Sequence, residues 1–198
     1  MKRIKKVETN YAKKDTYYEL NKICQEALKE NNCFTVIVLS YAMIEDRFLS
    51  FLYYLYLIDR NIEKPKPSPD IEKFVFEIMK SSRSNFFNLS TKIEIITKII
   101  KNKDCNYLSK DIYDLLDNSI GIEKVTIFLK KLTKWFTYRN DIIHASFNKS
   151  KKNLLETIEE QAKIGYDLSK QLSSFVNNIK YKNKSLRSQY ELGKCQYA

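Results

Sequence analysis

The chain has only 3 glycines and 3 prolines among its 198 residues, so it contains few of the residue types that interrupt helices and form turns. A β-sandwich or barrel needs many short strands joined by turns rich in these residues. Their scarcity argues against such an architecture and favours long helices. All three prolines fall within residues 63–70, which we expect to form a loop.

The sequence also lacks the patterns that hold metals or cofactors. Its 4 cysteines lie at positions 24, 33, 105 and 195 without a C-x-x-C pair, which matches neither a zinc site nor a disulfide framework. It has 1 histidine, no H-E-x-x-H motif, no glycine-rich phosphate loop and no carboxylate cluster suited to a metal. We therefore predict no metal and no cofactor, and the cysteine usage fits a reducing cytoplasm.

No long apolar run is free of charge. Residues 36–58 are long enough to span a bilayer, but Glu45, Asp46 and Arg47 interrupt the centre of this stretch, where charges are costly in hydrocarbon. No apolar segment follows the basic N-terminus, so a signal peptide is not predicted. We expect a buried amphipathic helix here, a cytoplasmic protein and no membrane partner.

Acidic residues are outnumbered in this chain. It has 35 Lys and Arg against 24 Asp and Glu, which gives a net charge of +11. A field of this sign attracts polyanions, and nucleic acid is the first candidate. The chain is also rich in Lys, Asn, Ile and Tyr, a bias that an AT-rich genome produces without selection for binding. Composition alone leaves both interpretations open.

Apolar residues recur at spacings of three and four, which is typical of amphipathic helices. We expect helices over residues 9–31 and 34–55, shorter helices ending near residues 79, 100 and 118, and long helices over 125–143 and 154–179. Thr91-Lys92-Ile93-Glu94 matches a capping box at the start of the helix that ends near residue 100. Gly121 occupies a C-terminal cap position.

The predicted fold class is therefore all-α, a single bundle of about four or five main helices. Residues 1–180 would form this helical domain. Residues 181–198 are basic and carry few apolar residues, so we expect a flexible C-terminal tail there.

The segment Arg139-Asn140-Asp141-Ile142-Ile143-His144 contains the only histidine of the chain. Histidine takes and gives protons near neutral pH, and arginine is a fixed cation whose planar fork of donors suits phosphate. Together they suffice to cleave a phosphodiester without metal. On a continuous helix the two side chains lie about 140° apart, so the productive arrangement needs a loosened helix end or an arginine that reaches across a groove. Asn140 or Asp141 would fix the imidazole tautomer.

A second group of charged residues lies in the apolar helix over 34–55. In the functional interpretation, Glu45 or Arg47 reaches the motif and supports His144, and Arg47 is an RNA or dimer contact. In the structural interpretation, the group forms an internal ion pair or faces solvent.

Aromatic residues precede the motif. Trp135 and Tyr138, beside Lys134, would stack bases next to a phosphate contact, or would form a dimer contact. Aromatics at helical spacing are also common in cores, and Phe136 is expected there.

The segment Tyr138-Arg139-Asn140-Asp141-Ile142-Ile143-His144-Ala145, near the end of a penultimate long helix, resembles the signature of the HEPN superfamily. That signature is an arginine, a polar residue that is often asparagine, a few further residues and a histidine. The resemblance covers roughly residues 9–179. Many HEPN proteins are metal-independent endoribonucleases of toxin–antitoxin, phage-defence and CRISPR-linked systems, and they act as dimers whose motifs face each other across a cleft.

The resemblance implies a function for both ends of the motif. Arg139 would orient or stabilise the phosphate, and His144 would be general base or acid as the 2′-hydroxyl attacks. The products would carry 2′,3′-cyclic phosphate and 5′-hydroxyl ends. Acid–base cleavage uses two proton-transfer groups, and a two-fold homodimer supplies two histidines where one chain supplies one.

The resemblance also implies the partners: RNA, a second copy of the chain and an antitoxin or neighbouring-gene protein. One HEPN toxin group has a tyrosine two residues after the histidine that a partner enzyme modifies. This chain has Ser146 there, so neutralisation by that chemistry is not expected. The alternative function is a non-catalytic HEPN module that binds RNA or a partner protein.

Overall fold

The computed structural model describes residues 10–58, 88–104, 107–145 and 157–194, and this part is all-α with no strand. The predicted proline loop and the helix ending near residue 79 lie outside the described residues. The described helices are α1 (Asn10–Lys29), α2 (Cys33–Tyr54), α4 (Leu89–Lys101), α5 (Tyr107–Ser119), α6 (Ile122–Ala145) and α8 (Ile158–Lys194).

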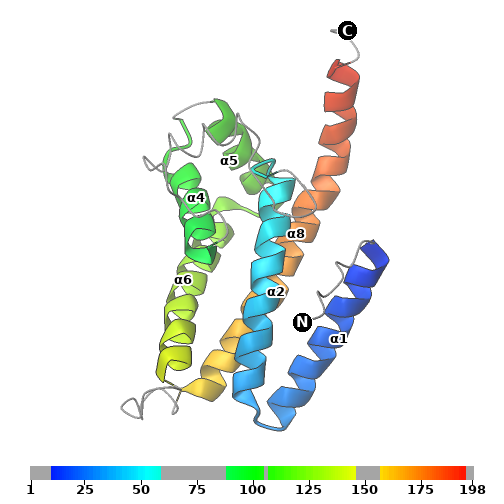
Figure 1. Cartoon of the computed structure of the whole chain (residues 1–198). Helices are drawn as coiled ribbons and strands as arrows, with labels where there is room; N and C mark the ends of the chain where they lie inside the picture. Colours follow the sequence, from blue (N-terminus) through cyan, green and yellow to red (C-terminus); the bar gives the residue numbers. More distant parts are fainter. Residues whose placement is uncertain (1–9, 59–87, 105–106, 146–156, 195–198) are drawn as a thin grey trace, which may run out of the picture.

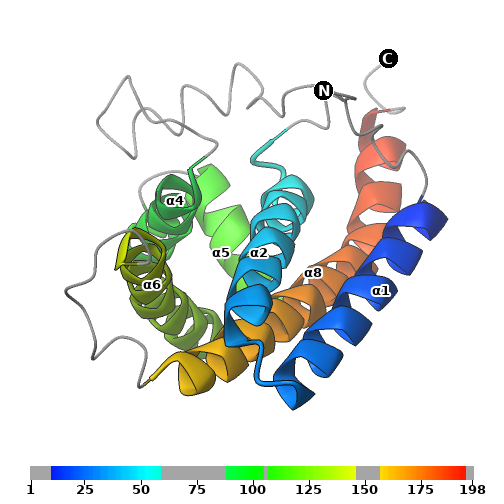
Figure 2. The same cartoon turned by 60° about the horizontal axis from the view of Figure 1, so that its bottom comes forward.

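Helix α2 is the centre of the fold. It packs most extensively against α8, and it also contacts α1 and α4. Figure 1 shows α2 and α8 side by side, with α1 on one side of them and α4 and α6 on the other. Figure 2 keeps this order and shows α5 beside α4 and α6. Apolar faces of these helices meet in one core, as their spacing predicted; its largest fully buried side chains include Phe48, Phe51, Phe128 and Trp135.

Local residues account for the ends of two helices. Helix α1 ends just before the Asn31-Asn32 pair, where Asn31 adopts a positive φ of 56° and the Asn32 side chain accepts a hydrogen bond from the Thr35 amide at 3.3 Å. Asparagine tolerates both roles well. After α5, Gly121 has φ +92° and its amide bonds the Asp117 carbonyl at 2.9 Å. The cap predicted at Gly121 is confirmed.

The start of α4 differs from the prediction. The helix begins at Leu89, and the N-cap is Asn88, whose side chain accepts from the Ser90 amide at 3.2 Å. Thr91 therefore lies inside the helix, and Glu94 pairs with Lys98 at 3.1 Å. The capping-box interpretation is wrong because Asn88 provides a competent cap three residues earlier.

Helix α8 also differs, because it continues to Lys194 through most of the segment predicted to be a tail. Apolar spacing ends near Ile179, but the sequence then contains no proline and no glycine before Gly193, so nothing local ends the helix. Lys182 Nζ donates to the Asn118 carbonyl and so connects this part of α8 to the end of α5.

Helices α6 and α8 approach closely where Trp135 lies against Gly165. The Trp135 side chain is 1% exposed, and its indole Nε1 donates to the Gln161 carbonyl at 2.8 Å. A Cβ atom at residue 165 would overlap the Trp135 ring, well inside van der Waals contact. The absence of a side chain at residue 165 therefore permits this crossing.

We expect Gly165→Ala to lower the free energy of unfolding by about 1–3 kcal/mol, because the new methyl group overpacks a ring that its hydrogen bond holds in place. At most helix positions the same change is stabilising, since glycine is the poorer helix former. Urea unfolding followed by circular dichroism measures the difference.

Ser174→Ala, at an exposed position of the same helix, is the control and should change the free energy by less than about 0.5 kcal/mol. The cost of Gly165→Ala should shrink in a Trp135→Phe background, because the smaller ring makes room. Equal stability of Gly165→Ala and wild type would contradict this packing.

Candidate functional site

The motif lies on the last turns of α6, which remains helical from Arg139 through Ala145. The five-residue separation therefore places Arg139 and His144 about 140° apart around the helix. Arg139 is half-buried, whereas His144 is exposed in the final turn. Within the described part of the chain, no hydrogen bond or ion pair joins His144 to Arg139 or Asn140. The sequence predicted either a loosened helix end or an arginine that reaches across a groove. The helix end does not loosen, because α6 stays helical through His144.

Arg139 points toward α2, and its guanidinium lies over the ring of Tyr41. Its Cζ atom is 3.8 Å from the ring centroid, a close cation–π contact. Arg139 Nη1 donates to Asn140 Oδ1 at 3.0 Å. Arg139 Nε is buried and has no hydrogen-bond partner. The guanidinium is thus held by an aromatic face and an amide.

Tyr41 is itself fixed by two further contacts. Its ring stacks on Phe136 of α6, with centroids 6.0 Å apart and planes 19° from parallel. Its hydroxyl donates to Glu45 Oε1 at 3.3 Å. Burial, followed by the Glu45 carboxylate, raises the pKa of Tyr41, although Arg139 lowers it. The hydroxyl therefore stays protonated and keeps donating.

Asn140 and Asp141 are both half-buried, and the structure gives Asn140 a role other than the predicted one. Its Oδ1 accepts a hydrogen bond from Arg139. Asn140 therefore orients the arginine in this structure, in place of the histidine.

The charged residues of α2 divide between two sides of the helix. Glu45 is linked to the motif indirectly: it accepts a hydrogen bond from Tyr41, whose ring contacts Arg139 and not His144. Arg47 lies over the ring of Tyr17 on α1, with its Cζ 3.7 Å from the centroid. The Tyr17 hydroxyl donates to Asp46 Oδ2 at 2.6 Å. The structure thus brings Glu45 to the motif and directs Arg47 to α1.

The aromatic residues before the motif lie deeper than predicted. Trp135 is 1% exposed, so it is not an exposed stacking platform, and that prediction is wrong. The cause is the gap at Gly165, which admits the indole between α6 and α8. Tyr138 is half-buried, and its hydroxyl accepts a hydrogen bond from Thr157 Oγ1 at 3.1 Å. Lys134 is exposed, as a phosphate contact requires.

Lys92 of α4 is a residue that the sequence analysis assigned only to a cap. It is 1% exposed, although lysine is rarely buried. Burial lowers the pKa of Lys92, and the nearby Glu45 and Asp46 carboxylates raise it less. The available signal was its position three residues after Leu89 and one before Ile93, within the apolar stripe of α4.

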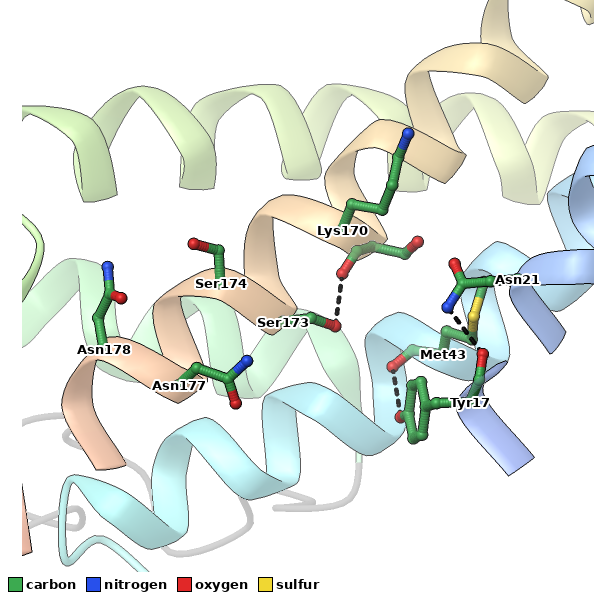
Figure 3. Close-up of a pocket in the computed structure, with 9 residues that line it drawn as sticks. Tyr17, Asn21, Met43, Lys170, Ser173, Ser174, Asn177 and Asn178 are labelled. Carbon is green, nitrogen blue, oxygen red and sulfur yellow. Dashed lines mark hydrogen bonds between the residues drawn. The ribbon is translucent and has the colours of Figure 1, made fainter. Parts of the chain in front are cut away.

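A polar groove of about 380 Å³ lies between α1, α2 and α8, away from the motif (Figure 3). Several of its donors are used within their own helices: Asn21 Nδ2 bonds the Tyr17 carbonyl at 2.7 Å, and the Ser173 hydroxyl bonds the Ser169 carbonyl at 3.0 Å. The groove was not predicted from the sequence. Its lining residues are Tyr17, Asn21, Met43, Ser169, Lys170, Ser173, Ser174, Asn177 and Asn178.

Among the described residues, no helix is long and apolar enough to cross a membrane. Among the same residues, no group of three or more His, Cys, Asp or Glu side chains is placed to hold a metal ion.

We expect Lys92→Met to raise the free energy of unfolding at pH 7 by about 1 kcal/mol. Because the pKa of Lys92 is lower in the folded protein, the unfolded chain binds more protons between that pKa and the ordinary value of 10.5. Stability of the wild type should therefore rise with pH across this window, and Lys92→Met should lack this rise. Urea unfolding from pH 7 to 10.5 measures both effects.

Lys98→Met, which removes a more exposed ammonium from the same helix, is the control and should leave the pH dependence of the wild type intact. A loss of stability in Lys92→Met at pH 7 would show that Lys92 is a net stabilising partner of the α2 carboxylates.

Comparison of the chain with protein-family models, with curated proteins and with solved structures finds no match.

Proposed function

We propose that the chain is a metal-independent endoribonuclease of HEPN type, acting as a toxin or phage-defence effector. The observation that carries the proposal is the arrangement on the last turns of α6. There a guanidinium is held over the Tyr41 ring and bonded to Asn140, and an exposed imidazole lies less than two helical turns further on. The net charge of +11 would draw RNA to this surface.

The reaction requires one proton removed and one delivered. An unprotonated His144 takes the proton of the ribose 2′-hydroxyl, and the 2′-oxygen forms a bond to phosphorus. The bond between phosphorus and the 5′-oxygen breaks, and a protonated histidine gives that oxygen its proton. The products are a 2′,3′-cyclic phosphate and a 5′-hydroxyl. Arg139 stabilises the negative charge that builds on the phosphoryl oxygens.

The separation of the two motif ends supports a two-fold dimer. In one chain Arg139 faces α2 while His144 faces solvent, so a single motif does not surround one phosphate. A second copy related by two-fold symmetry adds a second His144 and a second Arg139 to the same cleft. One histidine then serves as base and the other as acid. An antitoxin or neighbouring-gene protein would neutralise the dimer.

A second candidate function is a HEPN module that binds RNA or a partner protein without cleaving it. The observation that favours it is that Asn140, which would orient the imidazole, is bonded to Arg139. This candidate requires phosphate contacts but no proton transfer, so His144 would be dispensable.

We expect the purified protein to cleave labelled structured RNA in EDTA and to leave cyclic-phosphate ends, while His144→Ala and Arg139→Ala lose at least about a hundredfold in rate. Gel electrophoresis with end-group analysis measures this. Expression of the wild type should also arrest growth of the host, and expression of His144→Ala should not.

The matched control is Lys124→Ala, which removes one exposed positive charge from the opposite end of α6 and should cleave at the wild-type rate. Equal cleavage by wild type and His144→Ala would identify a contaminating nuclease. Salt-sensitive RNA binding without cleavage by any variant, and without toxicity, would favour the binding module.

A further inference from the structure

Arg139 is a half-buried cation that no carboxylate neutralises directly. Among the described residues no ion pair reaches Arg139, and Glu45, which is linked to it through Tyr41, bonds the tyrosine hydroxyl instead. Arginines that are taken from water are normally paired with an anion. Here the compensation comes from the face of an aromatic ring, which attracts the cation without cancelling its charge.

The stack also decides which part of the guanidinium a ligand meets. Tyr41 lies against the guanidinium carbon, and Nη1 donates to Asn140 Oδ1 at 3.0 Å. Nε is buried without a partner, so a ligand reaches the guanidinium only through its terminal amino groups. These donors lie in one plane, the geometry that binds a phosphate with two parallel hydrogen bonds.

Tyr41 is rigid enough to impose this geometry. Phe136 packs against its ring and Glu45 holds its hydroxyl, so both ends of the side chain are fixed. Tyr41 comes from α2, the central helix, whereas Arg139 comes from α6. The orientation of the arginine is therefore set by the core of the fold, through a residue outside the motif.

We propose that Tyr41 is a positioning residue for Arg139: it holds the guanidinium over its ring, with the terminal amino groups left to bind a phosphate of RNA. This inference rests on the proposed function for the identity of the anion. The stack itself is independent of that function, and the two are tested separately.

The first measurement concerns the stack alone and uses no RNA. In a ¹⁵N-labelled sample, the Nε–Hε signal of Arg139, assigned by its loss in Arg139→Lys, should be shifted upfield by the Tyr41 ring. Tyr41→Phe should keep this shift, because the ring remains. Tyr41→Leu should lose it. A wild-type signal at the position of a free arginine would overturn the proposal, even if Tyr41→Leu did not fold.

The second measurement asks whether the stack serves phosphate binding. Tyr41→Leu should weaken binding of single-stranded RNA about tenfold and lower the slope of log K against log salt by about 0.7, the value for one phosphate contact. Arg139→Ala should lower the slope equally. Tyr41→Phe should bind as the wild type does, a rescue that a loss of general stability would not give.

The control is Tyr113→Leu. Tyr113 is also half-buried and carries a cation, Lys103, at 5.2 Å from its ring, but it lies on α5 away from the motif. This variant should match the wild type in affinity and slope. Wild-type affinity in Tyr41→Leu, with loss in Arg139→Ala, would overturn the positioning role and leave the proposed function standing.

A different outcome is that neither the wild type nor any variant binds RNA, while the Arg139 signal still depends on the Tyr41 ring. The proposed function would then fail, and RNA would be overturned as the source of the anion. Tyr41 would still be shown to hold Arg139 in place.

Discussion

The structure depends on how α2 accommodates two half-buried carboxylates, Glu45 and Asp46, beside its buried face. An ionised carboxylate removed from water is costly unless hydrogen bonds replace its hydration. Two tyrosine hydroxyls do this: Tyr17 donates to Asp46 at 2.6 Å, and Tyr41 donates to Glu45 at 3.3 Å. Each ring then presents a face to a guanidinium. The hydrogen bond to Asp46 therefore connects α2 to α1 through Tyr17. The Tyr41 ring, whose hydroxyl bonds Glu45, connects α2 to α6 through Arg139.

This arrangement makes one contact serve both folding and the candidate site. The ring whose hydroxyl satisfies Glu45 is packed by Phe136 and covered by Arg139, and both of these residues belong to α6. The side-chain contact between α2 and α6 therefore also orients the guanidinium. The buried Lys92 adds a charge from α4 near these carboxylates, and burial lowers its pKa more than their attraction raises it.

Helix positions could be predicted because apolar spacing marks one face of each helix, and the cap at Gly121 could be predicted because glycine tolerates a positive φ. The burial of Trp135 did not follow. Its cause is Gly165, thirty residues away on another helix, and no local pattern links the two. For Arg139 the motif indicated the residue, but its partner Tyr41 occupies an ordinary position on an apolar helix. The sequence showed the charges of Glu45 and Asp46, but it did not show that the tyrosines Tyr41 and Tyr17 donate hydrogen bonds to them.

The two tyrosine–arginine stacks show what does and does not distinguish a site. Arg47 and Arg139 have the same environment: a ring face at 3.7 or 3.8 Å and a buried Nε without a hydrogen-bond partner. An orphaned donor of this kind costs about 1–3 kcal/mol, and the attraction between the guanidinium and the ring offsets part of that cost. At Arg47 the stack joins α1 to α2, so its role there is structural. At Arg139 the same geometry occurs on the last turns of α6, beside the amide of Asn140 and less than two turns before the exposed His144. A stacked arginine alone is therefore not a site, and the proximity of a proton-transfer group is what gives the second stack a chemical use.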